Sequence, residues 1–215
     1  MFIGHYAPAF IAAAATRRTV TLGPLFVAAQ LVDLAFMCFV LVGIEHLRLV
    51  PGITAMNPMD LYDMPITHSL LGAVTFGIGF GFLIWLARRD LLAASIGAAV
   101  VISHWFLDLL VHRPDLTLAG SPPKLGFGLW NDPLIEMPLE ALLVFGSFAW
   151  FLRRTRGPIG WAIALGVAMA AFMAIDWFGP KPTEMTAMMS ISALFAYLVL
   201  TSLAWKVGAT RRLGT

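Results

Sequence analysis

The sequence predicts an all-α membrane protein, a bundle of six transmembrane helices preceded by a short helix that enters the bilayer only partway. Hydrophobic residues make up 60% of the 215 residues and charged residues only 12%, and the mean hydropathy is +0.85. Soluble domains are about half apolar and a quarter charged. Six stretches are apolar and long enough to cross a bilayer as helices. Basic residues cluster in alternate connections between them, as in multi-pass membrane proteins.

The elements follow from these apolar stretches in chain order. A short apolar segment runs from Phe2 to Thr16, and Arg17 and Arg18 follow it, whereas a signal peptide has its basic residues first. We therefore expect this segment to stay in the mature protein as the half-inserted helix. The spanning helices are predicted at 24–47, 65–87, 91–111, 134–152, 158–178 and 185–205. We therefore expect one membrane domain over residues 1–215. The connection 113–132 contains several glycines and prolines and is predicted to form a structured lid.

The basic residues predict the orientation of the bundle. Ten of the fourteen fall on alternate connections, which the positive-inside rule assigns to the cytoplasm: Arg17, Arg18, Arg88, Arg89, Arg153, Arg154, Arg156, Lys206, Arg211 and Arg212. The sequence thus predicts a multi-pass protein of the bacterial cytoplasmic (inner) membrane with a cytoplasmic C-terminus. The basic residues need no nucleic-acid partner to explain them. The single cysteine, Cys38, excludes a disulfide scaffold.

Histidine and aspartate side chains from four helices are predicted to reach one layer on the outer side of the bilayer midplane. His104, Asp108 and His112 are spaced i, i+4, i+8 and form one polar stripe on an apolar helix. A rise of about 1.5 Å per residue brings His5 and Asp33 close to the same depth, and His68 stands at the outer start of its helix. Because an ionisable residue inside a span is costly, this convergence indicates a functional site.

Two interpretations of this layer stay open. In the first interpretation, a divalent metal is bound by His5, Asp33, His68, His104 and Asp108. In the second, the same groups form hydrogen bonds across the bundle as structural contacts. Imidazole and carboxylate without thiolate suit zinc, with manganese and iron as alternatives. Asp108 either ligates the metal or orients a histidine that does. A site with an open position would lower the pKa of bound water to near 7, which is hydrolytic chemistry.

The motifs resemble a known family. Gly4-His5, Val32-Asp33-Leu34, Thr67-His68-Ser69 and Ser103-His104 followed by Asp108 are similar to those of the bacterial inner-membrane metal-dependent hydrolases of the YdjM-like group. The resemblance extends to about residue 115 and, in motif logic, more distantly to zinc-dependent phospholipase C and P1-type nucleases. It implies a hydrolase whose metal ligands are His5, Asp33, His68, His104 and Asp108. It also implies that the N-terminal amine can serve as a further ligand.

Further polar residues are assigned expected places around this layer. Glu140, one turn after Glu136, is the predicted general base, with Asp108 as the other candidate catalytic carboxylate, and only Glu140 is expected to be truly inserted. Glu45 and His46 are expected to be exposed at a helix end. The residues that could support the ligands or contact substrate are His112, Asp115, Asp63, Arg113 and Lys124, the last two suiting an anionic group such as phosphate.

The predicted function is a metal-dependent membrane hydrolase that acts on an ester or phosphoester at a site open to the outer face. A lipid or lipid-linked substrate fits a site at bilayer depth, and membrane lipids are the expected partners. A metal-ion or proton pathway and a non-catalytic membrane partner with structural polar residues are the alternatives; a haem protein with paired histidines is a more distant one. The sequence contains no Gly-x-Ser-x-Gly elbow and no Walker loop.

Overall fold

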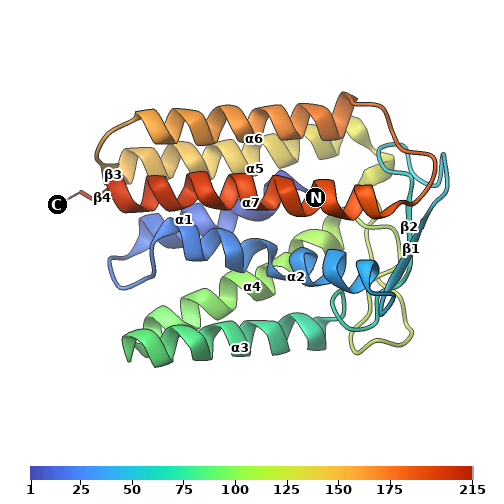
Figure 1. Ribbon diagram of the computed structural model, residues 1–215, viewed down its shortest axis with the longest axis horizontal. Helices are drawn as coiled ribbons and strands as arrows, with labels where there is room; N and C mark the ends of the chain where they lie inside the picture. The colour runs from blue at the N-terminus through green and yellow to red at the C-terminus, as the bar shows by residue number, and fades with distance from the viewer. Residues whose placement is uncertain (215) are drawn as a thin grey trace.

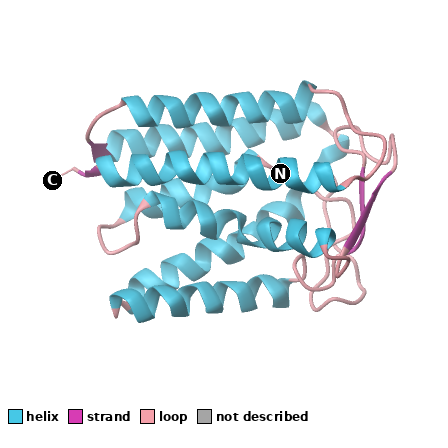
Figure 2. Cartoon of the chain, in the orientation of Figure 1, coloured by secondary structure: helices cyan, strands magenta, loops and turns pink. Residues whose placement is uncertain are grey.

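A computed structural model describes residues 1–214, and over these residues the chain folds into an all-α bundle (Figures 1 and 2). The helices are α1 (Ala7–Ala15), α2 (Leu22–Leu41), α3 (Leu70–Arg88), α4 (Leu91–Val111), α5 (Pro133–Arg154), α6 (Gly160–Phe178) and α7 (Ala187–Thr210). Two 3₁₀ turns, η1 (Ile3–Tyr6) and η2 (Leu129–Asn131), complete the helical elements. Within the described residues, six helices, α2 to α7, are long and apolar enough to cross a membrane, which confirms the predicted fold class.

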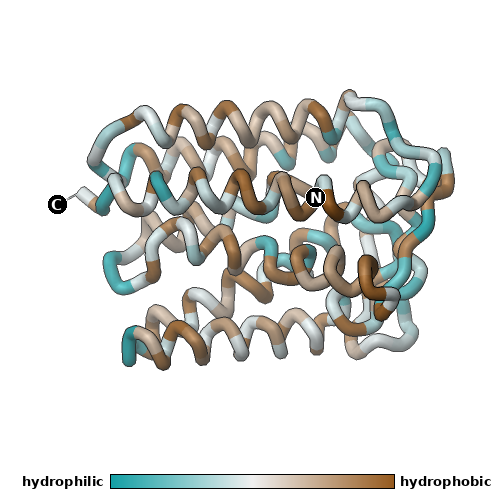
Figure 3. Tube along the Cα trace, viewed as in Figure 1, coloured by the Kyte–Doolittle hydropathy of each residue, from teal (hydrophilic) through white to brown (hydrophobic). Residues whose placement is uncertain are grey.

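The helices pack around α2, and hydrophobic residues recur along the length of the helices (Figures 1 and 3). α3 packs on α4, and α2 packs on both α4 and α7, while α6 packs on α7. The short α1 packs on α5 and α2. The chain start lies between the two ends of the bundle, so η1 and α1 reach from one end only partway along it (Figure 1). The half-length first helix predicted from the sequence is therefore present.

The two ends of the bundle differ in character. At one end, which we call the hairpin end, β1 (His46–Leu49) and β2 (Met59–Asp63) pair antiparallel, and residues 113–132 lie beside them (Figure 1). The other end, which we call the arginine-rich end, holds the α1–α2, α3–α4 and α5–α6 connections and the C-terminal segment. There the short strands β3 (Thr155–Arg156) and β4 (Arg212–Leu213) pair. The ten basic residues grouped from the sequence lie on these connections or in the adjacent turns.

The structure corrects the predicted boundaries of two helices. The helix predicted to continue to residue 47 ends at Leu41, because Gly43 adopts a left-handed conformation (φ +73°) that favours glycine. The chain then enters the β1–β2 hairpin, where Leu47 and Leu61 are buried and Arg48 faces outward. The helix predicted from 65 begins instead at Leu70, after Ser69 caps it by accepting a hydrogen bond from the Gly72 N–H.

Candidate metal centre

The carboxylate of Asp108, on α4, lies at the meeting point of four histidines. Its Oδ1 lies 3.0 Å from His5 Nε2 and 3.4 Å from His112 Nε2. Its Oδ2 lies 3.1 Å from His104 Nε2 and 3.7 Å from His68 Nε2. All five side chains are buried. The stripe predicted on α4 thus faces the half-length N-terminal segment and the start of α3.

A second carboxylate, that of Asp33 at mid-length of α2, faces two of the same histidines. Asp33 Oδ1 is 3.4 Å from His68 Nε2 and 3.5 Å from His104 Nε2. Its Oδ2 accepts a 3.4 Å hydrogen bond from the Tyr197 hydroxyl of α7. The structure therefore brings together all five residues that the sequence predicts as metal ligands. It also places His112 Nε2 beside them, next to Asp108.

Two overlapping sets of potential ligand atoms are close enough to share metal ions. His5, His104 and Asp108 offer atoms within 4.8 Å of one another, and so do Asp33, His68 and His104. His104 Nε2 and Asp108 Oδ2 are both buried and make no hydrogen bond within residues 1–214, although they are only 3.1 Å apart. Buried polar atoms normally have a partner, so this pair fits two ligands that approach one cation side by side.

Hydrogen bonds on the far side of the imidazole rings fix which nitrogen faces the centre. His104 Nδ1 lies 2.9 Å from the Ala29 carbonyl oxygen, and because a carbonyl only accepts, Nδ1 carries the hydrogen. His112 Nδ1 lies 2.8 Å from Asp115 Oδ1 in the same way. In the neutral ring the Nε2 lone pair is then directed at the centre, as in histidines that ligate metals.

His68 is oriented through a relay that ends at Glu45. The Thr67 hydroxyl donates to Glu45 Oε2 at 2.6 Å, so its oxygen accepts from His68 Nδ1 at 2.9 Å. Glu45 Oε1 accepts from the backbone N–H groups of Ile66 and Thr67 at 2.7 and 2.9 Å. The expectation that Glu45 is exposed is wrong, because the side chain is fully buried. α2 ends at Leu41, four residues before Glu45, and the chain then turns so that Glu45 contacts the segment that carries His68.

The electrostatics of the cluster favour an added positive charge. Burial lowers the pKa of the His112 imidazole, but Asp108 and Asp115 outweigh it and raise that pKa to about 9. A proton or a metal ion could supply such charge. The rings of His5 and His104 stack in parallel with centroids 3.7 Å apart, and two protonated rings would repel at that separation. This contact favours neutral imidazoles, which are the form that binds metal.

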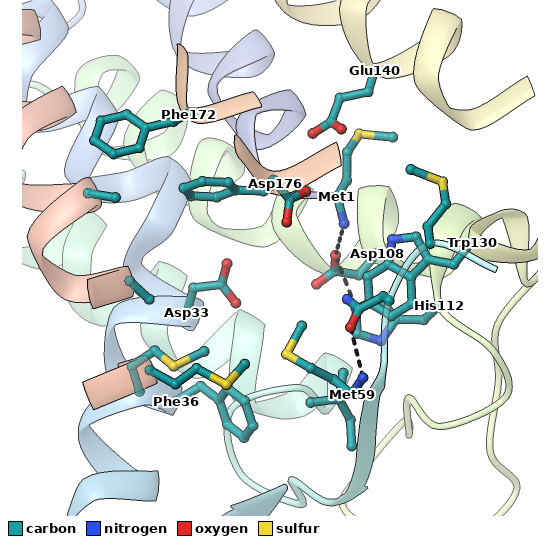
Figure 4. Close-up of a pocket in the computed structure, with 18 of the residues that line it drawn as sticks. Met1, Asp33, Phe36, Met59, Asp108, His112, Trp130, Glu140, Phe172 and Asp176 are labelled. Atoms are coloured by element: carbon teal, nitrogen blue, oxygen red, sulfur yellow. Dashed lines mark hydrogen bonds and ion pairs between the residues drawn. The ribbon is translucent and has the colours of Figure 1, made fainter. Parts of the chain in front are cut away.

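Glu140, predicted as the general base, holds the N-terminal segment in place. Its Oε1 accepts a 2.8 Å hydrogen bond from the Gly4 N–H, and its Oε2 accepts a 3.1 Å bond from Trp177 Nε1. Both oxygens are thus engaged, and one of them fixes the turn that carries His5. The Met1 amino nitrogen lies 3.4 Å from Asp108 Oδ1, between that carboxylate and Glu140 (Figure 4).

Glu136, one turn earlier on α5, is expected from the sequence to be less inserted than Glu140, and its side chain is buried as well. The side chain is only 1% exposed, although Leu134, Ile135 and Pro138 beside it are exposed, because Glu136 lies on the face of α5 that lines the cavity inside the bundle. Its Oε2 is buried without a hydrogen-bond partner among the described residues. Unlike Glu140, this carboxylate is therefore free to exchange a proton with a ligand.

A cavity of about 340 Å³ adjoins the cluster. Its polar wall includes Asp33, Asp108 and His112, with Glu140 on the opposite side (Figure 4). Glu136, also on α5, belongs to the same wall. Its remaining wall is mostly apolar: Phe36, Met37, Met56, Met59, Leu61, Phe172, Ile175 and Met189. The hairpin residues in this group place the cavity toward the hairpin end. A cavity with one polar wall and one apolar wall suits an amphiphilic ligand.

The other residues predicted around the site are engaged with the protein itself. Arg113 forms ion pairs with Asp60 and, at 3.6 Å, with Asp115, and Lys124 donates to the Tyr62 carbonyl at 3.1 Å. Asp63 pairs with His46 at 2.7 Å across the hairpin. The 113–132 connection is tied to the start of α3, and its Trp130 ring packs against His112 with centroids 4.2 Å apart. Trp130 thus covers one side of the cluster.

The fold and the cluster together define a class: an all-α, multi-pass membrane protein with a buried histidine–aspartate centre beside a cavity. No protein-family model, no curated protein and no solved structure matches the chain. The resemblance to the YdjM-like hydrolases therefore stays a prediction from the motifs quoted above.

Proposed function

We propose that the protein is a metal-dependent membrane hydrolase, with His5, Asp33, His68, His104 and Asp108 as its ligands and His112 as a further one. One observation carries the proposal: the Nε2 atoms of four histidines converge on two carboxylates, while the Nδ1 atoms of three of them are tied to groups outside the cluster. Such an arrangement is the one that metal-ligating histidines require.

The donor set supports a divalent ion of the zinc class, with manganese or iron as alternatives, because it offers imidazole and carboxylate without thiolate. A metal ion held there would supply Lewis-acid chemistry for the attack of water on an ester or phosphoester. Two overlapping ligand sets that share His104 leave room for one or two ions.

The two glutamates of α5 take different roles in this proposal. Glu136 lies on the cavity wall and has a buried oxygen without a hydrogen-bond partner in the described part of the chain, so we assign it proton transfer with water or the leaving group. Glu140 is a positioning residue, because its two oxygens hold Gly4 and Trp177. The sequence had nominated Glu140 for the first role.

The substrate we propose is an amphiphile, a lipid or a lipid-linked ester. The cavity combines the polar cluster with a wall of methionine, phenylalanine and leucine side chains, which would accept an acyl chain. By the positive-inside rule the arginine-rich end lies in the cytoplasm of a bacterial cell, so the cavity at the hairpin end opens to the outer face of the inner membrane.

Metal analysis is the first test of this function. The protein, purified in detergent, is equilibrated with zinc, manganese or iron, and bound metal is measured by mass spectrometry. We expect about one or two ions per chain, lost in His104→Ala and Asp33→Asn. The matched control is His46→Ala, because His46 is a half-exposed histidine of the hairpin that lies outside the cluster. It should bind metal as the wild type does.

Hydrolysis of p-nitrophenyl esters and of bis(p-nitrophenyl) phosphate tests the chemistry. Glu136→Gln should lower kcat by about 10²- to 10⁴-fold and keep the metal, as expected for the loss of a proton-transfer group. Glu140→Gln should instead lower thermal stability and metal retention. If no ion binds above background and the cluster variants fail to fold, the polar residues are structural contacts. Weak, freely exchanging metal without turnover would point to an ion pathway.

A further inference from the structure

A second cavity, of about 370 Å³, lies at the arginine-rich end of the bundle, away from the hairpin end where the first one lies. It is enclosed by the connection between α1 and α2, the first turn of α2, the last turns of α5 and α7, and the C-terminal segment. Arg17, Arg211 and Arg212 line it, together with Thr19, Thr21 and Leu22. Neither the predicted function nor the metal centre uses any of these residues.

The described lining of this cavity is positively charged and contains no carboxylate. No aspartate or glutamate is among its lining residues, and within residues 1–214 none of the three arginines forms an ion pair. Arg211 is only 7% exposed and donates to the Thr155 hydroxyl and to the carbonyls of Leu152, Thr155, Gly157 and Pro158. Burial, and then the charge of Arg156, lower the pKa of its guanidinium. Buried charge with only neutral acceptors is costly and favours a nearby anion.

The other two arginines retain hydrogen-bond donors for a ligand. Arg17 uses Nη2 alone, which donates to the carbonyls of Gly214 at 2.9 Å and Leu213 at 3.4 Å. Arg212 uses Nη1 alone, which donates to the Gly208 carbonyl at 2.7 Å. Their remaining N–H groups have no partner in the described part of the chain. Both side chains are exposed at the cavity, so two guanidinium groups can approach one ligand.

Two further polar features of the lining suit an anion. α2 begins at Leu22, and its N-cap residue is Thr21. The Thr21 side chain accepts no hydrogen bond from the first backbone N–H groups of the helix, which form its positive end. Thr19 is 8% exposed, and its hydroxyl oxygen has no hydrogen-bond partner among residues 1–214. A ligand oxygen in the cavity would give that buried hydroxyl the acceptor it lacks.

We propose that this cavity binds a phosphate group. A phosphate offers several acceptor oxygens and negative charge to the arginines, to Thr19 and to the start of α2. The cavity lies where membrane-length helices begin or end, at Leu22, Arg154 and Thr210, which is the level of lipid headgroups. An anionic phospholipid is one source of the group, and free phosphate is the other. The proposal does not rest on the proposed hydrolase function.

Native mass spectrometry of the full chain in a neutral detergent tests the site. Phosphatidylglycerol is titrated at about 0.15 M ionic strength, which screens distant charges, and dioleoylglycerol serves as the lipid without phosphate. We expect one retained phosphatidylglycerol and no comparable retention of dioleoylglycerol. The double variant Arg17→Gln/Arg212→Gln should bind phosphatidylglycerol about 30-fold more weakly, as expected for the loss of two basic contacts.

The matched control is Arg88→Gln/Arg89→Gln, which removes the same charge from the same end of the bundle but outside the cavity. It should change the affinity by less than about threefold. Because Arg17 also holds the C-terminal segment, Thr19→Val provides a second variant. It removes only a hydroxyl that has no hydrogen-bond partner among residues 1–214, so this variant should fold normally and still bind more weakly.

The source of the phosphate is decided by a competition arm with inorganic phosphate. If inorganic phosphate binds alone, displaces the lipid and depends on Thr19 and the two arginines, the site is a phosphate site supplied from solution. If it does not compete while phosphatidylglycerol binding depends on those residues, the lipid headgroup is the source. If neither ligand binds, or the control variant loses as much affinity as the cavity variants, the proposal is overturned.

Discussion

At the scale of single residues, Thr67 decides what its neighbour His68 can bind. Its hydroxyl hydrogen is committed to Glu45, so its oxygen can only accept from His68 Nδ1, and the His68 lone pair at Nε2 is left for the centre. A side chain that never reaches the cavity thus sets the tautomer of one that lines it. Such outer hydrogen bonds are worth about 10- to 100-fold in metal affinity in characterised sites.

Thr67→Val should weaken metal binding by about 10- to 100-fold without unfolding the protein. Valine has nearly the same shape, but it removes the acceptor for His68 Nδ1 and the donor to Glu45 Oε2. A competition titration with a chromophoric zinc chelator measures the effect. Thr67→Ser keeps the hydroxyl and is the matched control, with an affinity close to that of the wild type. An unchanged affinity in Thr67→Val would show that the relay does not orient His68.

The central residues of the site could be predicted from the sequence, but the burial of the glutamates around them could not. An ionisable side chain in an apolar run is unusual, and the helical rise gives its depth in the bilayer. These two signals were enough to assign five residues to one layer: His5, Asp33, His68, His104 and Asp108. The burial of Glu45 and Glu136 could not be found this way. Each lies near the end of an apolar run, where the sequence alone does not distinguish solvation at the rim from a turn back into the bundle.

At the scale of elements, the first turn of α3 is shaped around the peptide that carries His68. The Ile66 carbonyl lies against Gly72 so closely that a β-carbon on Gly72 would stand 1.7 Å from that oxygen. The Gly72 N–H donates to Ser69 Oγ, and Ser69 Oγ in turn donates to the Ile66 carbonyl at 3.2 Å. Gly72 is therefore what allows residues 66–69 to fold tightly over the helix start.

Gly72→Ala should displace this turn, lower the stability by about 1–3 kcal/mol as overpacking does, and reduce the bound metal through His68. Gly79→Ala is the matched control on the same helix, because a β-carbon there meets nothing within 4 Å. Alanine is the better helix former, so Gly79→Ala should be neutral or stabilising. Thermal unfolding in detergent and metal content check both variants. Equal behaviour of the two would contradict the role of Gly72.

Long helices were predictable from the sequence and the short hairpin was not. Six apolar runs of membrane length leave little choice, because a backbone in lipid must satisfy its own hydrogen bonds. The β1–β2 hairpin is only four and five residues per strand, and its first strand follows directly on an apolar run. Its alternation of buried Leu47 and Leu61 with outward Arg48 is too short to compete with the helical pattern before it.

At the scale of the whole molecule, the bundle separates its charges. The arginine-rich end carries the large majority of the basic residues, while the carboxylates lie in the other half and around the cavity of the metal centre. The single described carboxylate at the arginine-rich end, that of Asp90, caps α4 and pairs with Arg18 at 2.9 Å. A bilayer accepts such a molecule in one orientation far more readily than in the other.

This asymmetry makes the proposed orientation testable by cysteine labelling in a Cys38→Ser background. Phe127→Cys, at a position 72% exposed at the hairpin end, should react with a membrane-impermeant maleimide in intact cells. Arg156→Cys, exposed at the arginine-rich end, should react only after the cells are permeabilised. The reverse pattern would place the cavity of the metal centre on the cytoplasmic side and overturn the orientation, while the fold would stand.

The bond from Gly4 to Glu140 also sets an order of events during biosynthesis. The two residues are 136 positions apart in the chain, so the first segment leaves the ribosome long before its anchor has been made. Until α5 joins the bundle, the turn that carries His5 has its contacts with α2 and α4 but lacks the hydrogen bond from the Gly4 N–H to Glu140. A nascent chain that ends at His112 contains all four histidines of the cluster but not Glu140, the partner of the Gly4 N–H. This contact of the turn that carries His5 can therefore form only after most of the bundle has been synthesised.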